Sequence, residues 1–132
     1  MKRRTYLKSM MAGAGAAALA TAAETGGSKP IELHVDMSVD PAKEQEMLHN
    51  FHTIIKPAAM KQNGYIDVNV MKLRQAVAGK APEGMNYRFV LKFKSEELRQ
   101  VWINSATHKR VWPTVEKTLT TTNYNVLLFD LA

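Results

Sequence analysis

His108 is the residue whose position best suits acid–base chemistry. It belongs to a set of residues whose spacing repeats along one face of a helix. The set is Val101, Ser105, His108, Trp112, Val115 and Leu119. An imidazole has an ordinary pKa of about 6.5, so a ring partly removed from water in an apolar pocket suits a general base for a phenol or enol proton. The alternative is a core or interface histidine that is hydrogen-bonded to a backbone carbonyl.

His34 and Asp36 form a second candidate group. They stand two residues apart in a segment that alternates between apolar and polar residues, so on a strand they point to the same side. Asp36 could orient the His34 ring in a cavity, or both could lie on a sheet face buried between subunits. The periodicity leaves open which face lines a pocket. The candidate catalytic residues are therefore His108, His34 and Asp36.

Four aromatic residues are candidates for the walls of a substrate pocket. Large flat side chains can bind a flat ligand, although core packing is their commoner role. The four are Trp102, Trp112, Tyr65 and Phe93.

The sequence gives little support to a metal site. The chain has no Cys, which removes thiolate ligands, thiolate catalysis and disulfides. His49 and His52 could share a ligand at helical spacing, but no other metal-binding pattern accompanies them. Three of the eight Met lie within the first eleven residues, and the other five are scattered. We expect no metal.

The positive charge of the chain is concentrated at its beginning. The formal net charge is +6, from 18 Lys and Arg against 12 Asp and Glu. Residues 1–22 hold four of the basic residues and none of the acidic ones, so the rest of the chain carries about +2. The basic segment Arg88–Phe93 lacks the glycine of an RNA-binding sheet motif. We therefore expect no nucleic-acid partner.

Residues 1–22 match the plan of an export signal. A basic start is followed by an apolar stretch of roughly 14 residues and by Ala20-Thr21-Ala22, a small-residue cleavage site. Arg3-Arg4-Thr5-Tyr6-Leu7-Lys8 resembles the twin-arginine export motif. The apolar stretch is too short for a stable membrane anchor. We expect export machinery as a partner and a periplasmic or secreted protein; the alternative is a basic arm on a cytosolic protein.

The remaining 110 or so residues suit one domain. Residues 23–30 read as a flexible lead, and 31–132 as the folded domain. The alternation of apolar residues predicts strands, and the 3.6-residue spacing predicts helices. The strands are expected over 31–39, 65–77, 86–94 and 123–131, and the helices over 42–63 and 95–118. Asp40-Pro41 begins the first helix, and Pro57 should weaken it. Asn104-Ser105 and Pro113 should divide the second helix.

This order, β-α-β-β-α-β, predicts a ferredoxin-like α+β fold with one antiparallel sheet and two helices on one face. The other face of the sheet is then open and carries apolar as well as polar residues. An open face of that kind is unusual on a monomer. We expect a homodimer in which two sheets pack face to face.

Four segments are similar to segments of a known family, and they are Val39–Glu44, Asn63–Ile66, Phe93–Leu98 and Trp102–His108. Together they resemble the dimeric α/β-barrel superfamily, and most closely its antibiotic biosynthesis monooxygenase branch. The related stress-responsive barrel branch also has a histidine on its first strand and another on its second helix, which His34 and His108 fit in part. The resemblance implies a small homodimeric enzyme that oxidises quinol-like or polycyclic aromatic substrates with O₂ and without a bound cofactor.

A haem-degrading subgroup of that branch uses an Asn on strand one, a Trp at the end of strand three and a His on helix two. Here strand one offers His34 and Asp36, and strand three ends in Phe93, so two of the three positions differ. Two hypotheses follow. The first is an exported, cofactor-independent oxygenase with His108 as base. The second is a non-catalytic member of the fold that binds an aromatic or haem-like ligand, or only assembles.

Overall fold

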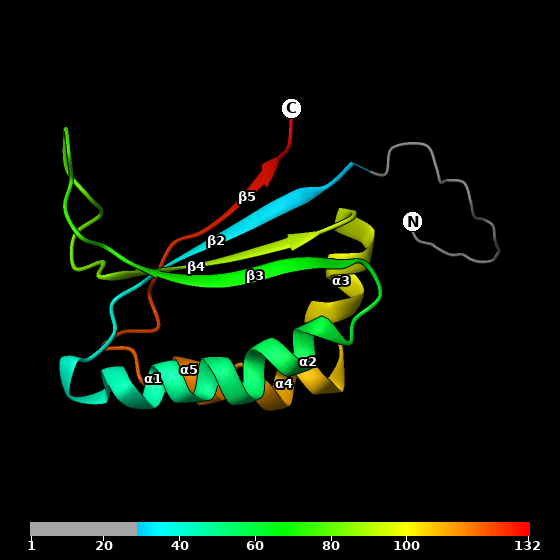
Figure 1. Cartoon of the computed structure of the whole chain (residues 1–132), viewed down its shortest axis with the longest axis horizontal. Coiled ribbons are helices and arrows are strands. Elements are labelled where there is room, and N and C mark those ends of the chain that lie inside the picture. The colour runs from blue at the N-terminus through cyan, green and yellow to red at the C-terminus, as the bar shows by residue number, and fades with distance from the viewer. Residues whose placement is uncertain (1–28) are drawn as a thin grey trace, which may run out of the picture.

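The computed structural model describes residues 29–132. The expected signal peptide and residues 23–28 of the expected lead lie outside the described residues. The described chain folds into a four-stranded antiparallel sheet with helices on one face, in the strand order β3-β4-β2-β5 (Figure 1). The strands are β2 (Ile31–Met37), β3 (Tyr65–Lys72), β4 (Tyr87–Phe93) and β5 (Val126–Asp130). This confirms the predicted ferredoxin-like α+β fold.

The first helical connection is less regular than one continuous helix. Asp40 caps it through a bond from the Ala42 amide, with Pro41 in the first turn as predicted. The segments are η1 (Pro41–Lys43), α1 (Glu44–Asn50), the π-helical η2 (Phe51–Ile55) and α2 (Lys56–Met60). The predicted disturbance at Pro57 thus lies in the turn before it. Proline provides no amide for the Thr53 carbonyl and crowds that carbonyl, which explains this position.

The second helical connection is divided where Asn104-Ser105 and Pro113 predicted. Its parts are α3 (Glu96–Ile103), α4 (Ala106–Val111) and α5 (Pro113–Glu116). Ser95 caps α3 and Ser105 caps α4. The predicted stripe assumed one continuous helix and is wrong at Val101, which is 66% exposed. The break at Asn104-Ser105 rotates α3 relative to α4, so Trp102 packs against the sheet instead.

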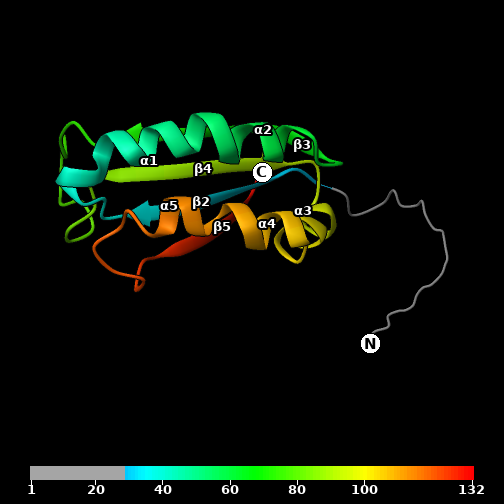
Figure 2. The same cartoon turned by 90° about the horizontal axis from the view of Figure 1, so that it is seen from below.

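The two helical connections run side by side across one face of the sheet (Figure 2). The hydrophobic core lies between them and the strands. Along β2, Ile31, Leu33, Val35 and Met37 all face this core, as alternation requires. Each strand ends earlier than predicted, at Lys72 instead of Val77 in the case of β3. A β-bulge between Tyr65 and Asp67 interrupts the pairing of β3 with β4, and Ile66 at this bulge is 43% exposed.

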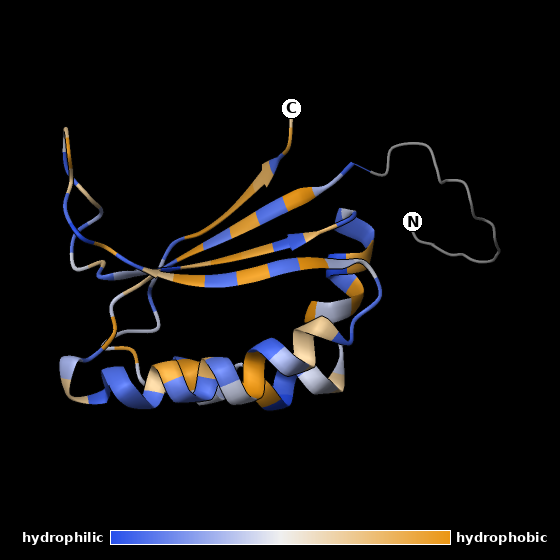
Figure 3. Ribbon diagram, in the orientation of Figure 1, coloured by the Kyte–Doolittle hydropathy of each residue, from blue (hydrophilic) through white to orange (hydrophobic). Residues whose placement is uncertain are grey.

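The edge strand β5 differs from the other three. Hydrophobic and hydrophilic residues alternate along β2 and β3, and along β4 except at Val90, whereas β5 is hydrophobic on both faces (Figure 3). Val126, Leu127, Leu128 and Phe129 are all about half exposed. Among residues 29–132, no helix has the length and apolar character needed to cross a membrane.

Candidate functional site

A mainly apolar cavity of about 130 Å³ lies between the sheet and the second helical connection. Its walls are side chains of β2 and β4, Ile55 of η2, and residues of α3, α4 and the chain leading into β5. The lining residues that carry polar side-chain groups include Arg99, His108 and Tyr124. Dry apolar cavities of about 150 Å³ hold one benzene ring. The enclosed space therefore suits a single six-membered ring.

His108 lies in the first turn of α4, where its amide bonds to the Ser105 hydroxyl oxygen at 3.0 Å. Its ring lies edge-on to Trp102, with centroids 5.1 Å apart, and nearly parallel to Trp112 at 6.3 Å. Burial lowers the pKa of His108, and the positive charge of Arg99 lowers it further. The imidazole is therefore neutral at pH 7 and can accept a proton.

Arg99 places a buried positive charge at the same cavity. It is 8% exposed, and its Nε and Nη2 donate to the two carboxylate oxygens of Glu96 at 2.7 and 2.8 Å. This fork fixes the guanidinium and leaves further N–H groups of its five for a ligand. The sequence interpretation missed Arg99. Its only sequence signal is an ordinary i, i+3 ion pair, which on most helices is a surface feature.

Trp112 is held in place by a short chain of hydrogen bonds. Its indole Nε1 donates to the Tyr124 hydroxyl at 3.1 Å, and that hydroxyl donates to Glu116 Oε2 at 2.6 Å. Burial and the bond to Glu116 raise the pKa of Tyr124 to about 12, so the phenol stays protonated. Tyr124 and Glu116 thus fix the indole plane that lies against His108.

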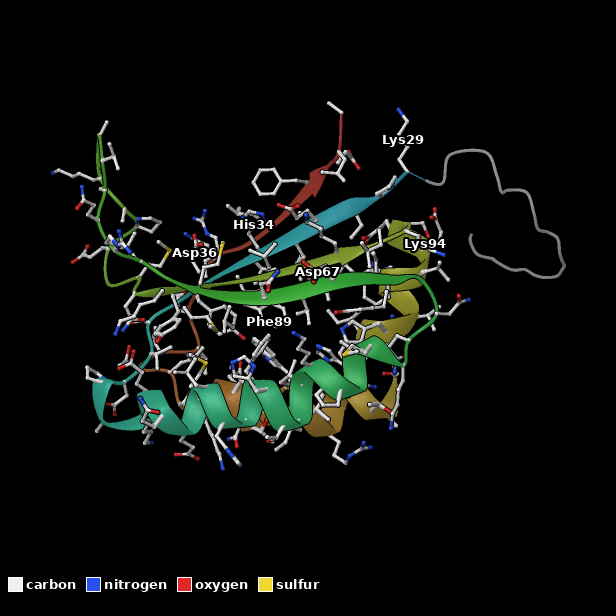
Figure 4. The ribbon with its side chains drawn as sticks, viewed as in Figure 1. Lys29, His34, Asp36, Asp67, Phe89 and Lys94 are labelled. Atoms are coloured by element: carbon white, nitrogen blue, oxygen red, sulfur yellow. The ribbon has the colours of Figure 1, made fainter. Side chains whose placement is uncertain are left out.

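The sheet separates His108 from the other two candidate catalytic residues. His34 and Asp36 lie on the open face, whereas Phe89 points toward the helices (Figure 4). His34 Nε2 donates to Glu32 Oε1 at 2.6 Å, and Asp36 accepts from Arg88 Nε at 2.7 Å. Asp36 therefore pairs with Arg88 and does not orient the His34 ring. The structure favours the sheet-face interpretation of this pair over the cavity interpretation.

The four candidate wall residues divide in the same way. Trp102 and Trp112 line the cavity. Among the described residues, the lining does not include Tyr65, on β3 at the far edge of the sheet, or Phe93, which is fully buried in the core. Both were predicted from aromatic character alone, which does not distinguish a wall from a core residue.

The remaining two histidines, His49 and His52, are solvent-exposed. Residues 29–132 contain no group of three or more His, Asp or Glu side chains arranged to hold a metal ion. The expected absence of a metal stays a prediction for the chain as a whole.

Comparison with known proteins identifies the class of fold. No family model matches the chain, and no curated protein matches it in sequence. Solved structures, in contrast, do superpose on the chain. A proposed antibiotic biosynthesis monooxygenase from Caulobacter crescentus superposes with a TM-score of 0.65 at 13% identity, covering 80% of this chain and 92% of that one. These likenesses establish a ferredoxin-like fold of the kind found in that group of proteins.

Two further structures bear on chemistry and assembly. SnoaB, a cofactor-independent oxygenase from Streptomyces nogalater, was solved as a variant and superposes with a TM-score of 0.60 at 11% identity. The match covers 76% of this chain and 91% of that one. A dimeric ferredoxin-like protein of unknown function from Jannaschia gives a TM-score of 0.62 at 14% identity. It covers 78% of this chain and 98% of its own.

Proposed function

We propose that the protein is a cofactor-independent oxygenase that acts on a quinol-like, hydroxylated aromatic ring. The observation that carries this proposal is His108, a neutral imidazole in an apolar cavity between two indoles, beside the buried cation Arg99. A base of this kind removes a phenolic proton, and the aromatic walls hold a flat ring. The fold likeness to a cofactor-independent oxygenase supports the same chemistry.

In the proposed reaction a ring nitrogen of His108 accepts the proton of a substrate hydroxyl. The substrate anion transfers one electron to O₂, and the substrate radical and superoxide combine to form a C–O bond at a ring carbon. The terminal peroxide oxygen takes the proton from His108. The O–O bond then breaks, and that oxygen leaves as water with the hydrogen displaced from the carbon. Hydroquinone and O₂ thus give a hydroxyquinone and water.

Arg99 stabilises the anion in this scheme. A phenolate in an apolar cavity is costly unless a positive charge lies nearby, because the surroundings solvate it poorly. The fork to Glu96 fixes Arg99 before the substrate arrives, so little reorganisation is needed when the negative charge forms.

The binding-protein alternative uses the same cavity without turnover. An aromatic ligand fits it as well as a substrate does. A haem-like ligand would extend far beyond it, because a tetrapyrrole is several times larger than the single ring that about 130 Å³ admits. Turnover therefore distinguishes the two candidate functions.

We also propose that the protein is an exported homodimer whose open sheet faces pack together. Asp36 and Arg88 neutralise each other on that face, and Glu32 contacts both His34 and Lys92, so the charges of these side chains are paired within the sheet. Leu127 and Phe129 add exposed apolar surface. The structural similarity to a dimeric ferredoxin-like protein supports this assembly.

The proposal of export rests on residues 1–22. N-terminal sequencing of protein from the cell envelope tests it, and a chain beginning at Met1 contradicts it.

The test of the function measures oxygen uptake on a panel of hydroquinones with the wild type, His108→Ala and His49→Ala. The last variant removes an exposed helical histidine and is the matched control. We expect uptake to fall on the order of a hundredfold or more in His108→Ala only. With ¹⁸O₂ the product gains one labelled atom. Absent uptake, or equal uptake in all three proteins, contradicts the oxygenase; a co-purified aromatic without uptake favours the binding protein.

A further inference from the structure

The cavity has room for about one ring and opens to solvent at β5. Val126 of β5 and Ile103 at the end of α3 belong to the lining, yet they are 52% and 36% exposed. They form an apolar rim where the enclosed space meets solvent. A ligand that is larger than one ring must therefore leave the cavity across this rim.

The apolar surface continues from the rim along β5. Val126 pairs with Val35, and Leu128 pairs with Leu33, across the β2–β5 ladder. Directly paired residues point to the same face of a sheet. Since Leu33 and Val35 line the cavity, Leu128 continues the cavity wall outward on the helix side of β5. Leu128 is 45% exposed, so this strip of wall lies open.

The two faces of β5 suit different occupants. Leu127 and Phe129 lie on the open face of the sheet, where the proposed dimer contact lies. Val126 and Leu128 lie on the other face, which is continuous with the cavity. A second copy that packs on the open face leaves this strip uncovered.

We infer, on the basis of the proposed function, that the substrate is a single hydroxylated ring with a hydrocarbon tail. The ring fills the enclosed cavity, and the tail lies over Ile103, Val126 and Leu128. The cavity volume disfavours fused polycyclic rings, and the open apolar strip favours a tail. The sequence resemblance implies quinol-like or polycyclic substrates, and this inference restricts that class to single-ring substrates with a tail.

Binding can be followed without turnover. The chain has two tryptophans, and both line the cavity, so intrinsic fluorescence reports occupancy of this site. The probes are phenol, 4-propylphenol and 4-hexylphenol, with 1-naphthol and 9-phenanthrol as polycyclic comparisons. We expect the Kd to fall roughly two- to fourfold for each methylene, because each methylene removes apolar surface from water. Neither polycyclic probe should bind more tightly than 4-hexylphenol.

Two substitutions by serine separate the strip from general effects. Leu128→Ser should weaken 4-hexylphenol about tenfold and leave phenol within about twofold, because Leu128 lies on the strip beyond the cavity that holds the ring. Val77→Ser changes an 89% exposed loop residue and should alter neither probe. A Kd that does not change with tail length, or tighter binding of 9-phenanthrol, overturns the inference. A Leu128→Ser variant that binds both phenols as the wild type does also overturns it.

Oxygen uptake on an untailed hydroquinone separates this inference from the proposed function. If oxygen uptake depends on His108 but the Kd does not change with tail length, the proposed tail is contradicted and the proposed oxygenase activity is supported. If the Kd changes with tail length but no oxygen is taken up, the proposed ligand class is supported and the oxygenase activity is contradicted.

Discussion

His108 and His34 lie on opposite faces of one sheet and have opposite surroundings. His108 stands between two indoles in an apolar cavity, and burial lowers its pKa. His34 donates to Glu32 at 2.6 Å, which lowers the pKa of that carboxyl group, and its ring lies edge-on to Phe129. A base needs a free nitrogen lone pair and a site shielded from water. The comparison teaches that the face of the sheet, more than the residue type, decides which histidine suits proton transfer.

The same substitution on the two faces gives the largest expected difference. His108→Gln should lower kcat for hydroquinone oxidation on the order of a hundredfold or more, because glutamine cannot accept the proton. His34→Gln should change kcat less than about twofold. Steady-state oxygen uptake measures both. If His34→Gln is the damaging change, the assignment of the two faces is reversed.

Arg99→Met tests the charge on the cavity face. Removing the cation should lower kcat/KM about a hundredfold, because the substrate anion loses its stabilising charge. Arg99 lowers the pKa of His108, so its removal raises that pKa. His108 then stays protonated up to a higher pH, and the acid limb of the pH profile of kcat/KM should move to higher pH.

Arg99→Lys is the control for this prediction. It keeps the charge and loses the fork to Glu96, so the acid limb should stay near its wild-type position while kcat/KM recovers only in part. An acid limb that does not move in Arg99→Met would show that Arg99 acts only through packing.

Leu127→Asp tests the open face. A charge at the centre of an apolar contact between two sheets should weaken the proposed homodimer by at least about tenfold, because the carboxylate loses water on association. Sedimentation of the variant measures this change. Lys80→Asp, in an exposed loop, is the control and should leave the mass unchanged. A wild-type mass equal to one chain at micromolar concentration contradicts the dimer.

Asp36→Asn should have the smallest effect. It removes the charge that pairs with Arg88, whose side chain is 32% exposed, so we expect a loss of about 1–2 kcal/mol in the free energy of unfolding. The ring-binding cavity on the other face should be unaffected, and the Kd for phenol should stay within about twofold. Urea unfolding and fluorescence titration check the two parts. A large loss of phenol binding would place Asp36 in the site after all.

The element order could be predicted because it depends on local features. Asp40 with Pro41, and Ser95, begin helices by accepting bonds from nearby amides, and alternation identified the strands. The breaks in the second helix followed from Asn104-Ser105 and Pro113. These signals act within a few residues, so no tertiary information was needed.

The candidate site could be predicted only in part. His108 and Trp112 were found because apolar spacing predicts a face that meets the sheet, and Trp102 was found from its aromatic character alone. Arg99 was missed because a buried arginine and an exposed one look alike in sequence, and only the packing of α3 on the sheet buries it. Tyr65 was expected at the cavity, but the strand order sets its strand, β3, at the opposite edge of the sheet from β5. Phe93 was expected there too, but it is fully buried in the core.

The sequence by itself determined the order of strands and helices, the positions of the helix caps and breaks, and the concentration of charge in residues 1–22. Tertiary structure alone decided which face of the sheet lines the cavity. Residues two apart on a strand share a face, and alternation indicates which face is apolar, but it does not say whether a pocket lies on that face or on the other. The covering helices put His108 beside Arg99 and left His34 and Asp36 on the other side of the sheet. Contacts between distant segments made that choice, and no local pattern encodes them.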